Sequence, residues 1–348
     1  MEIHDTWPIG VAIYIIGTLM GGLGANLQRK SFIQKQKNDA ISTNDYTSNS
    51  MEHQKTFALG LTLFICSGIF MSLALIFTSQ TSLAPLLLFL LVFNAGFANI
   101  INKERIDWIG LDGLAMVIVV IGISMAIVGA PKESETYNLD QVKTLMSSTG
   151  FISFFVTVPT VIVIILTGKR VIEKRDLASS GYSAKIFLYI SYGALAGTFG
   201  GLNITSTKLL FATLIGGSED TGFVSVFTSP IVWLIAIFLV STYLLQLMIA
   251  IEGLEAASAI IVMSAHSVLE EIVASLGGIF CFDDAENFEQ WEWLMFFFGN
   301  ILALIGVFLL THSRLEHIIE EDHLLPDSSV ESSVEDGVEV TETPKLID

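Results

Sequence analysis

Runs of about 20 apolar residues recur along this chain, and they limit its fold more than any other feature of the sequence. A helix needs about 20 apolar residues to cross the roughly 30 Å hydrocarbon core of a bilayer. Because irregular backbone cannot face lipid, each such run is predicted to be a helix. The runs are residues 8–27, 56–79, 83–101, 109–130, 151–168, 186–210, 224–249, 256–280 and 291–311. Only Gln80, Thr81 and Ser82 separate the second and third runs, which predicts a tight hairpin. We therefore expect an all-α polytopic membrane protein with nine transmembrane helices, forming one membrane domain over residues 8–311.

The composition excludes several classes of protein. Hydrophobic residues make up 52% of the 348 residues and charged residues only 15%, unlike a water-soluble globule. The net charge of −18 argues against nucleic acid as a partner, because phosphate binding needs a basic surface. The sequence has no Walker A loop, no complete dinucleotide-binding motif and no cluster of His and Cys ligands. We expect neither an enzyme nor a bound cofactor.

The distribution of basic residues predicts the orientation in the membrane. With the amino terminus outside, 14 of the 17 Lys and Arg residues fall in cytoplasmic segments. Only Lys132, Lys143 and Lys208 fall on the other side. Cytoplasmic segments of membrane proteins carry an excess of Lys and Arg. The amino terminus is therefore expected outside, and the carboxyl terminus in the cytoplasm.

Two polar segments outside the apolar runs are expected to be flexible and cytoplasmic. Residues 28–55, rich in Asn, Ser, Thr and Lys, are predicted to form a flexible loop. Residues 312–348 are predicted to form a disordered acidic tail. This tail holds Glu320, Leu324 and Leu325 at the spacing of an acidic dileucine signal, which a sorting adaptor would read. The alternative, a juxtamembrane helix that no adaptor reads, stays open.

The two halves of the chain resemble each other. Residues 17–24 and 193–200 share the same glycine spacing, 176 positions apart (193 minus 17). A turn of small residues, a further run, an acidic and aromatic loop and a closing run follow in both halves. An odd number of runs separates equivalent helices, so spans 1–4 and 6–9 are predicted to form an inverted repeat with a site near the midplane. Glycines four residues apart are also ordinary helix-packing contacts.

Ionisable side chains inside the eighth run are the main candidates for function. A charge within a span costs roughly 2.5–3.5 kcal/mol on insertion scales and by default marks a functional site. His266 and Glu270 stand four residues apart on one helix face, and Glu271 lies on a neighbouring face. If both faces point into the bundle, these groups would suit a hard cation or a proton relay. The alternatives are acids in the membrane interface, or one acid paired with Lys208.

Three further polar residues are weaker candidates. Lys208, near the outer end of the sixth run, would snorkel to the headgroups or serve as a counter-charge, and its position favours snorkelling. Asn26 and Asn203 lie inside spans, where uncharged polar groups more often join helices than bind ligands.

Several short motifs resemble one known family. They are residues 81–86, the charged turn 102–105, the span that begins at Trp108, its exit at residues 129–133, and the segments 28–32 and 205–208. Together they resemble the NIPA-type magnesium transporters of the drug/metabolite transporter superfamily. The resemblance implies nine helices, inverted repeats and transport of a divalent cation.

The sequence therefore predicts a secondary transporter or facilitator of divalent cations, with Mg²⁺ as the expected ion. Glu270 and Glu271 are its predicted ligands, since Mg²⁺ keeps several waters and needs only one or two carboxylates. We expect the plasma membrane or an endosomal or lysosomal membrane. The alternatives are an organic-solute carrier of the same superfamily and a non-transporting scaffold whose acidic tail recruits partners. A homo-oligomer is left open.

Overall fold

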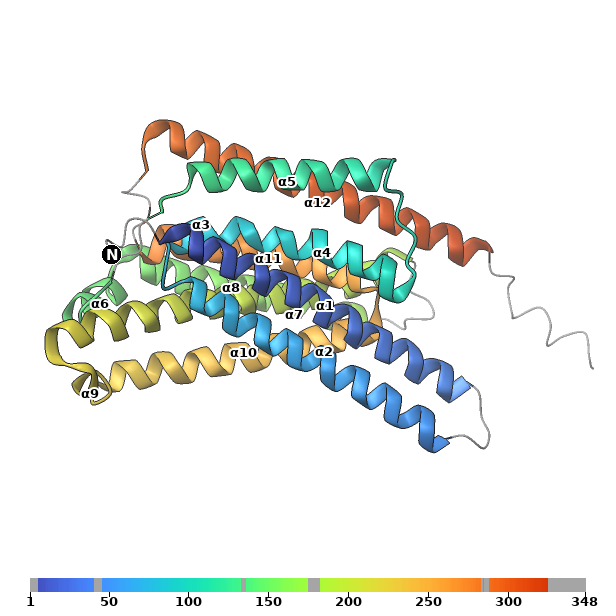
Figure 1. Ribbon diagram of the computed structural model, residues 1–348, viewed down its shortest axis with the longest axis horizontal. Helices are drawn as coiled ribbons and strands as arrows, with labels where there is room; N and C mark the ends of the chain where they lie inside the picture. Colours follow the sequence, from blue (N-terminus) through green and yellow to red (C-terminus); the bar gives the residue numbers. More distant parts are fainter. Residues whose placement is uncertain are drawn as a thin grey trace, which may run out of the picture.

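Long helices run side by side along the length of the molecule (Figure 1). The computed structural model describes residues 6–40, 46–132, 136–174, 182–282, 284 and 288–324, and within these ranges it contains only helices and their connections. The long helices are α1 (Trp7–Ala40), α2 (Tyr46–Ala74), α5 (Leu111–Gly129), α7 (Thr149–Lys174), α8 (Tyr182–Thr221), α10 (Pro230–Ala256), α11 (Ala259–Cys281) and α12 (Gln290–Leu324). Two short helices, α6 (Leu139–Met146) and α9 (Phe223–Val226), lie at the end of the bundle that holds the amino terminus.

Eight segments in the described part of the chain are long and apolar enough to cross a membrane. They coincide with eight of the nine predicted runs. The remaining predicted run, residues 186–210, lies within α8, which is long but less apolar. Residues 193–209 of α8 are buried except for the half-buried Phe199, so this helix is shielded from lipid by its neighbours. A helix enclosed by protein can carry small and polar residues that a lipid-facing helix could not.

The third apolar segment, Gln80–Asn102, is a broken helix. It consists of α3 (Gln80–Leu83), the 3-10 segment η2 (Ala84–Leu88), α4 (Phe89–Phe97) and the π-helical η3 (Ala98–Asn102). Pro85 lies in η2, where its missing N–H and its ring disfavour a regular α-helix. The hairpin predicted at Gln80–Ser82 is therefore misplaced: these residues are helical, Ser79 caps the helix, and the turn occupies residues 75–79.

The predicted flexible segments are more helical than expected. α1 continues to Ala40 and α2 begins at Tyr46, so most of the predicted loop 28–55 is helix. α12 continues to Leu324, so the predicted tail 312–348 begins as helix rather than as disordered chain. Of the proposed sorting signal, the side chains of Glu320 and Leu324 and all of Leu325 lie outside the described residues. Polar helices can extend beyond the bilayer, and an apolar run marks only the membrane-embedded part of each helix.

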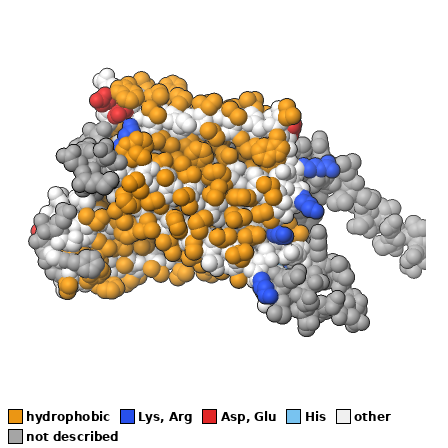
Figure 2. Space-filling view, in the orientation of Figure 1, with side chains coloured by type: hydrophobic (Ala, Val, Ile, Leu, Met, Phe, Trp, Pro, Cys, Tyr) orange, Lys and Arg blue, Asp and Glu red, His pale blue; other side chains and the backbone are white. Residues whose placement is uncertain are grey.

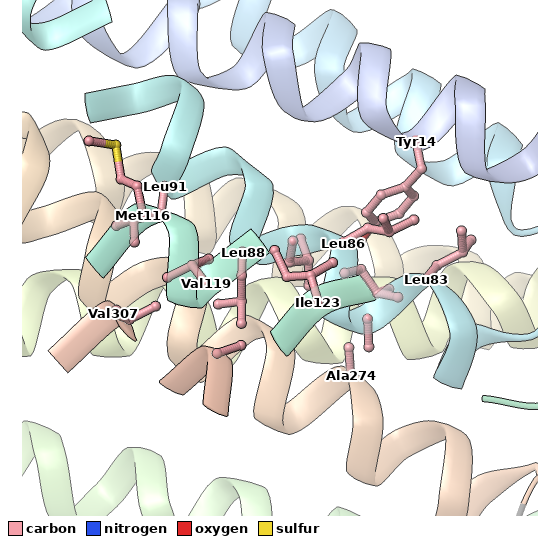
Figure 3. Close-up of a cluster of buried hydrophobic side chains, with 14 of the residues drawn as sticks. Tyr14, Leu83, Leu86, Leu88, Leu91, Met116, Val119, Ile123, Ala274 and Val307 are labelled. Carbon is pink, nitrogen blue, oxygen red and sulfur yellow. The ribbon is translucent and has the colours of Figure 1, made fainter. Parts of the chain in front are cut away.

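The broken third segment fills the centre of the bundle. Figure 3 shows Leu83, Leu86, Leu88 and Leu91 from this segment packed among buried side chains of α1, α5, α11 and α12. All four leucines are at most 1% exposed. This cluster therefore attaches the α5–α12 pair to the rest of the molecule.

The α5–α12 pair depends on close backbone contact. A Cβ atom built at Gly299 would lie 2.6 Å from the Gly122 carbonyl oxygen, and one built at Gly122 would lie 2.6 Å from the Gly299 carbonyl oxygen. Small residues at such crossings let two membrane helices approach and gain van der Waals contact. A side chain at either glycine would push the two backbones apart.

The surface is that of a membrane protein. Figure 2 shows hydrophobic side chains over the middle of the visible face, and Lys and Arg gathered mainly at the end opposite the amino terminus. Large apolar side chains such as Trp233, Ile237 and Phe308 are more than half exposed. Such a continuous apolar belt is stable only when lipid covers it.

Substituting Gly299 with alanine is expected to destabilise the fold. The added methyl group would meet the backbone of α5, and overpacking of this kind typically costs about 1–3 kcal/mol. We expect a lower melting temperature for Gly299→Ala in detergent, measured by fluorescence-detected size-exclusion after heating. Gly96→Ala is the control, because a Cβ atom at Gly96 has nothing within 4 Å. Equal melting temperatures for the two variants would contradict the close α5–α12 contact.

Candidate functional site

A small, partly enclosed cavity lies between helices from both halves of the chain. Its volume is about 40 Å³. A cavity needs about 10–15 Å³ to hold one water molecule, so this one has room for a few waters or one partly dehydrated ion. The lining residues come from α1, α2, α4, α8, α10 and α11, and the polar ones are Ser67, Ser72, Asn203, Tyr243, Gln246, His266 and Glu270. The cavity thus offers one carboxylate among mostly neutral oxygen and nitrogen groups.

Glu270 and His266 meet at this cavity, as their spacing predicts. His266 Nδ1 lies 3.2 Å from Glu270 Oε2, within ion-pair distance but without the angles of a good hydrogen bond. Gln246 Nε2 donates to Glu270 Oε1 at 3.3 Å and lies 3.2 Å from His266 Nε2. Both ionisable side chains are at most 4% exposed. The carboxylate is therefore held by weak polar contacts from two helices, which a cation could replace.

Glycines of α8 make room for this group. A Cβ atom at Gly200 would lie 2.5 Å from Glu270 Oε1 and 2.8 Å from Gln246 Nε2. One turn earlier, a Cβ atom at Gly197 would lie 3.0 Å from the Glu270 backbone nitrogen. The glycine spacing found in residues 193–200 thus serves two purposes: it brings α8 against α11 and leaves space for the Glu270 carboxylate.

Glu271 points elsewhere. It is 2% exposed, its Oε1 accepts a hydrogen bond from Ser275 Oγ at 3.0 Å, and it is not among the residues that line the cavity. Consecutive residues on an α-helix are about 100° apart, so two adjacent acids rarely face the same cavity. The structure therefore brings His266 and Glu270 together and separates them from Glu271. Within the described residues, no group of three or more His, Cys, Asp or Glu side chains is arranged to hold a metal ion.

Lys208 does not snorkel to the headgroups, so that expectation is wrong. It is 3% exposed, and its Nζ donates to the carbonyl oxygens of Leu75 and Thr78 at 3.1 and 3.3 Å. The reason is that α8 extends to Thr221, well beyond the apolar run that ended near Lys208. The ammonium is thus enclosed by protein and bound by the turn that follows α2.

The two predicted asparagines differ in their surroundings. Asn203 lines the cavity, and its side-chain amide donates to the carbonyl oxygen of Leu239 at 3.2 Å. Asn26 lies outside the cavity in a cluster of amides, where it donates to Asn94 Oδ1 at 2.7 Å and accepts from Asn102 Nδ2 at 2.8 Å. Asn26 therefore joins helices, whereas Asn203 lines the cavity.

Sequence reasoning underrated two glutamines. Gln246 supports Glu270, and Gln80 joins both halves by donating to Thr205 Oγ1 at 2.9 Å and to the Ala274 carbonyl oxygen at 2.6 Å. Gln80 was expected in a turn, although Ser79 before it is a typical helix N-cap that could have indicated the helix start. Gln246 gave no signal beyond being a polar residue in a span.

Comparison with known protein families identifies the family of this chain. The sequence profile described as "Magnesium transporter NIPA" matches residues 5–316. The match covers most of the chain, so the chain belongs to the NIPA family of magnesium transporters. The resemblance seen in short motifs is confirmed, and membership of this family, which is not an enzyme family, implies Mg²⁺ transport across a membrane. Neither a curated protein nor a solved structure matches the chain.

Alanine at Gly200 is expected to impair transport more than stability. The added methyl group would displace the ends of the Glu270 and Gln246 side chains, which can move without unfolding the bundle. Loss of an outer-shell partner of a metal typically costs about 10–100-fold, and we expect Gly200→Ala to lower Mg²⁺ uptake by about tenfold. Uptake by proteoliposomes that contain a magnesium dye measures the effect, with Gly96→Ala as the control. Normal uptake by folded Gly200→Ala would show that the position of Glu270 is unimportant.

Proposed function

We propose that Mg²⁺ crosses the membrane through the cavity between α1, α2, α8, α10 and α11, and that Glu270 is the carboxylate that binds it. The observation that supports this most is the buried Glu270 carboxylate in a small polar cavity between the two halves. A charge at such a depth is energetically costly, so its presence there by default marks a functional site. Asn203, Ser67 and Ser72 line the same cavity and can add neutral oxygens.

The chemistry of the cavity suits Mg²⁺. Mg²⁺ requires near-octahedral oxygen coordination and retains several waters, so one or two carboxylates are enough. The cavity beside Glu270, about 40 Å³, is smaller than the roughly 300–1,000 Å³ of sites for organic ligands, but it shares Gly68, Ser72 and Asn203 with an adjoining apolar pocket of about 360 Å³. The preference for an ion over an organic solute therefore rests on the Glu270 carboxylate rather than on volume. His266 and Gln246 contact the Glu270 carboxylate, and these are the contacts that a bound ion would replace.

The proposed topology has nine spans, with the amino terminus outside and the carboxyl terminus in the cytoplasm. α8 would be the sixth span, enclosed by the others. The basic end of the molecule, opposite the amino terminus in Figures 1 and 2, would then face the cytoplasm, as the excess of Lys and Arg requires. The opposite end, which holds the amino terminus, is the outer end of the molecule in this topology.

An inverted repeat of spans 1–4 and 6–9 is supported by the packing of equivalent helices. α5 and α12 are the closing spans of the two halves, and the Ile-Gly pair at residues 121–122 of α5 corresponds to that at residues 305–306 of α12. A Cβ atom at Gly122 would lie 2.6 Å from the Gly299 carbonyl oxygen, and one at the equivalent Gly306 would lie 2.8 Å from the carbonyl oxygen of Ala115, the equivalent of Gly299 at the same offset of 184 (306 minus 122). Reciprocal contacts are what a two-fold relation between two equal units produces. The glycines of α1 also make close contacts, as those of α8 do: a Cβ atom at Gly24 would lie 2.7 Å from the Gly60 carbonyl oxygen of α2.

The membrane potential is sufficient to drive uptake. One elementary charge moving through 100 mV gains about 2.3 kcal/mol, and a divalent ion gains about twice as much. No coupling ion is therefore needed.

We also propose a location in the plasma membrane or in endosomal or lysosomal membranes, with a sorting adaptor that recognises the tail. This part of the proposal rests on the dileucine spacing in the sequence.

The two adjacent acids of α11 provide a matched test. Glu270→Gln removes the carboxylate at the cavity, whereas Glu271→Gln changes an equally buried carboxylate that does not line it. We expect Glu270→Gln to lower Mg²⁺ flux by at least about tenfold, because even outer-shell losses have effects of this size. Glu271→Gln should keep most of the flux. Flux into proteoliposomes at an inside-negative potential measures both.

The opposite result would overturn the proposed site. If folded Glu270→Gln carries Mg²⁺ like the wild type, the ion does not depend on this cavity. If Glu271→Gln alone abolishes flux, the ion path lies on the other face of α11. Thermal stability of each variant separates loss of transport from loss of fold.

A further inference from the structure

Lys208 is a buried cation at the outer end of the proposed ion path. Its Nζ binds two backbone carbonyl oxygens, those of Leu75 and Thr78, at 3.1 and 3.3 Å. Leu75 directly follows the last residue of α2, and Thr78 lies in the turn after it, so neither carbonyl oxygen is bonded within a helix. They are also the kind of neutral oxygen that binds metal ions. The ammonium thus occupies oxygens that another cation could use.

This ammonium lies immediately beyond the cavity. Leu75 lines the cavity and also provides one of the two carbonyl oxygens that Lys208 binds. Ile204, one helical turn before Lys208 on α8, lines the cavity as well. An ion that leaves Glu270 toward the outer end would therefore pass close to the Lys208 charge.

Polar contacts between the two halves close the same end. Gln80 at the start of the third span binds both Thr205 of α8 and the Ala274 carbonyl oxygen of α11. Its Oε1 is buried and has no hydrogen-bond partner among the described residues. Thr81 donates from its backbone nitrogen and its hydroxyl group to Asp284 Oδ2. The outer end is thus shut by side chains rather than by continuous apolar packing, and such contacts can separate and re-form.

We propose that Lys208 is the outer gate of the Mg²⁺ path. The inference rests on the proposed function of the cavity at Glu270. In the closed state the ammonium binds the carbonyl oxygens of Leu75 and Thr78, and its positive charge repels a divalent ion at the outer end of the cavity. Like charges interact strongly where water is excluded. Opening requires the flexible lysine stem to withdraw the ammonium, which exposes these oxygens to the ion.

A purely structural role makes a different prediction. If Lys208 only holds the turn after α2, a neutral side chain that still donates a hydrogen bond should replace it, and the path should stay closed. If its charge is the gate, loss of the charge should open the path even when the hydrogen bond is kept. Lys208→Gln keeps a donor, Lys208→Met keeps only the apolar stem, and Lys208→Arg keeps the charge.

Accessibility of the cavity from outside tests the gate. Ser67 lines the cavity and is 5% exposed, and Ser67→Cys is a small change that reports on entry. Cys66 and Cys281 are free cysteines and are first replaced by alanine. The full chain in cells is treated from outside with a membrane-impermeant cationic thiol reagent. The rate at which the thiol introduced by Ser67→Cys is modified is then measured with Lys, Arg, Gln or Met at position 208.

We expect Lys208→Gln and Lys208→Met to raise the modification rate by about tenfold or more, the lower end of electrostatic effects on association rates, and Lys208→Arg to leave it unchanged. A rate for folded Lys208→Gln equal to that of the wild type would overturn the gate, and so would an increase in Lys208→Met alone. Mg²⁺ flux through Glu270→Gln, measured separately, tests the site itself. Loss of flux in Glu270→Gln together with a closed path in Lys208→Gln would refute the gate and leave the site standing.

Discussion

The close approach of α8 to α11 is the contact on which the rest of the site depends. Gly197 and Gly200 leave no side chain between the two backbones, and the Glu270 carboxylate fills the space that results. A carboxylate in this position would be very costly in lipid. Here it is enclosed by protein and supported by Gln246 and His266. The glycines therefore allow both the close packing of α8 against α11 and the position of the Glu270 carboxylate at the cavity.

The enclosure of α8 explains why a membrane protein can place polar residues at its centre. Lipid-facing helices must be apolar all along their exposed face, but α8 is surrounded by other helices over residues 193–209. It can therefore hold Asn203 beside the cavity and Lys208 beyond it. The outer helices α5, α10 and α12 supply the apolar surface that the bilayer requires. In the proposed function, the enclosed polar helix α8 lines the path of the ion, and the apolar outer helices separate that path from lipid.

The sequence predicted the helices and the pair of His266 and Glu270 well, because apolar run length and the four-residue spacing are local properties. It could not decide which of two adjacent acids faces the cavity, since that depends on how α11 is rotated against α8. Lys208 was misjudged because the end of the apolar run was taken as the membrane surface, although α8 continues to Thr221. The roles of Gln80 and Gln246 were not predicted because their contacts join segments far apart in the sequence. Rotation and long-range contact are properties of the assembled bundle.

Transport as proposed requires that one divalent ion bind at Glu270. Mn²⁺ suits the same oxygen ligands as Mg²⁺ and can be followed by electron paramagnetic resonance. The most direct measurement is Mn²⁺ binding to the purified protein, with Mg²⁺ as competitor, in the wild type and in Glu270→Gln. We predict one bound Mn²⁺ per chain that Mg²⁺ displaces, and its loss in folded Glu270→Gln. Binding that is unchanged in Glu270→Gln would contradict the account.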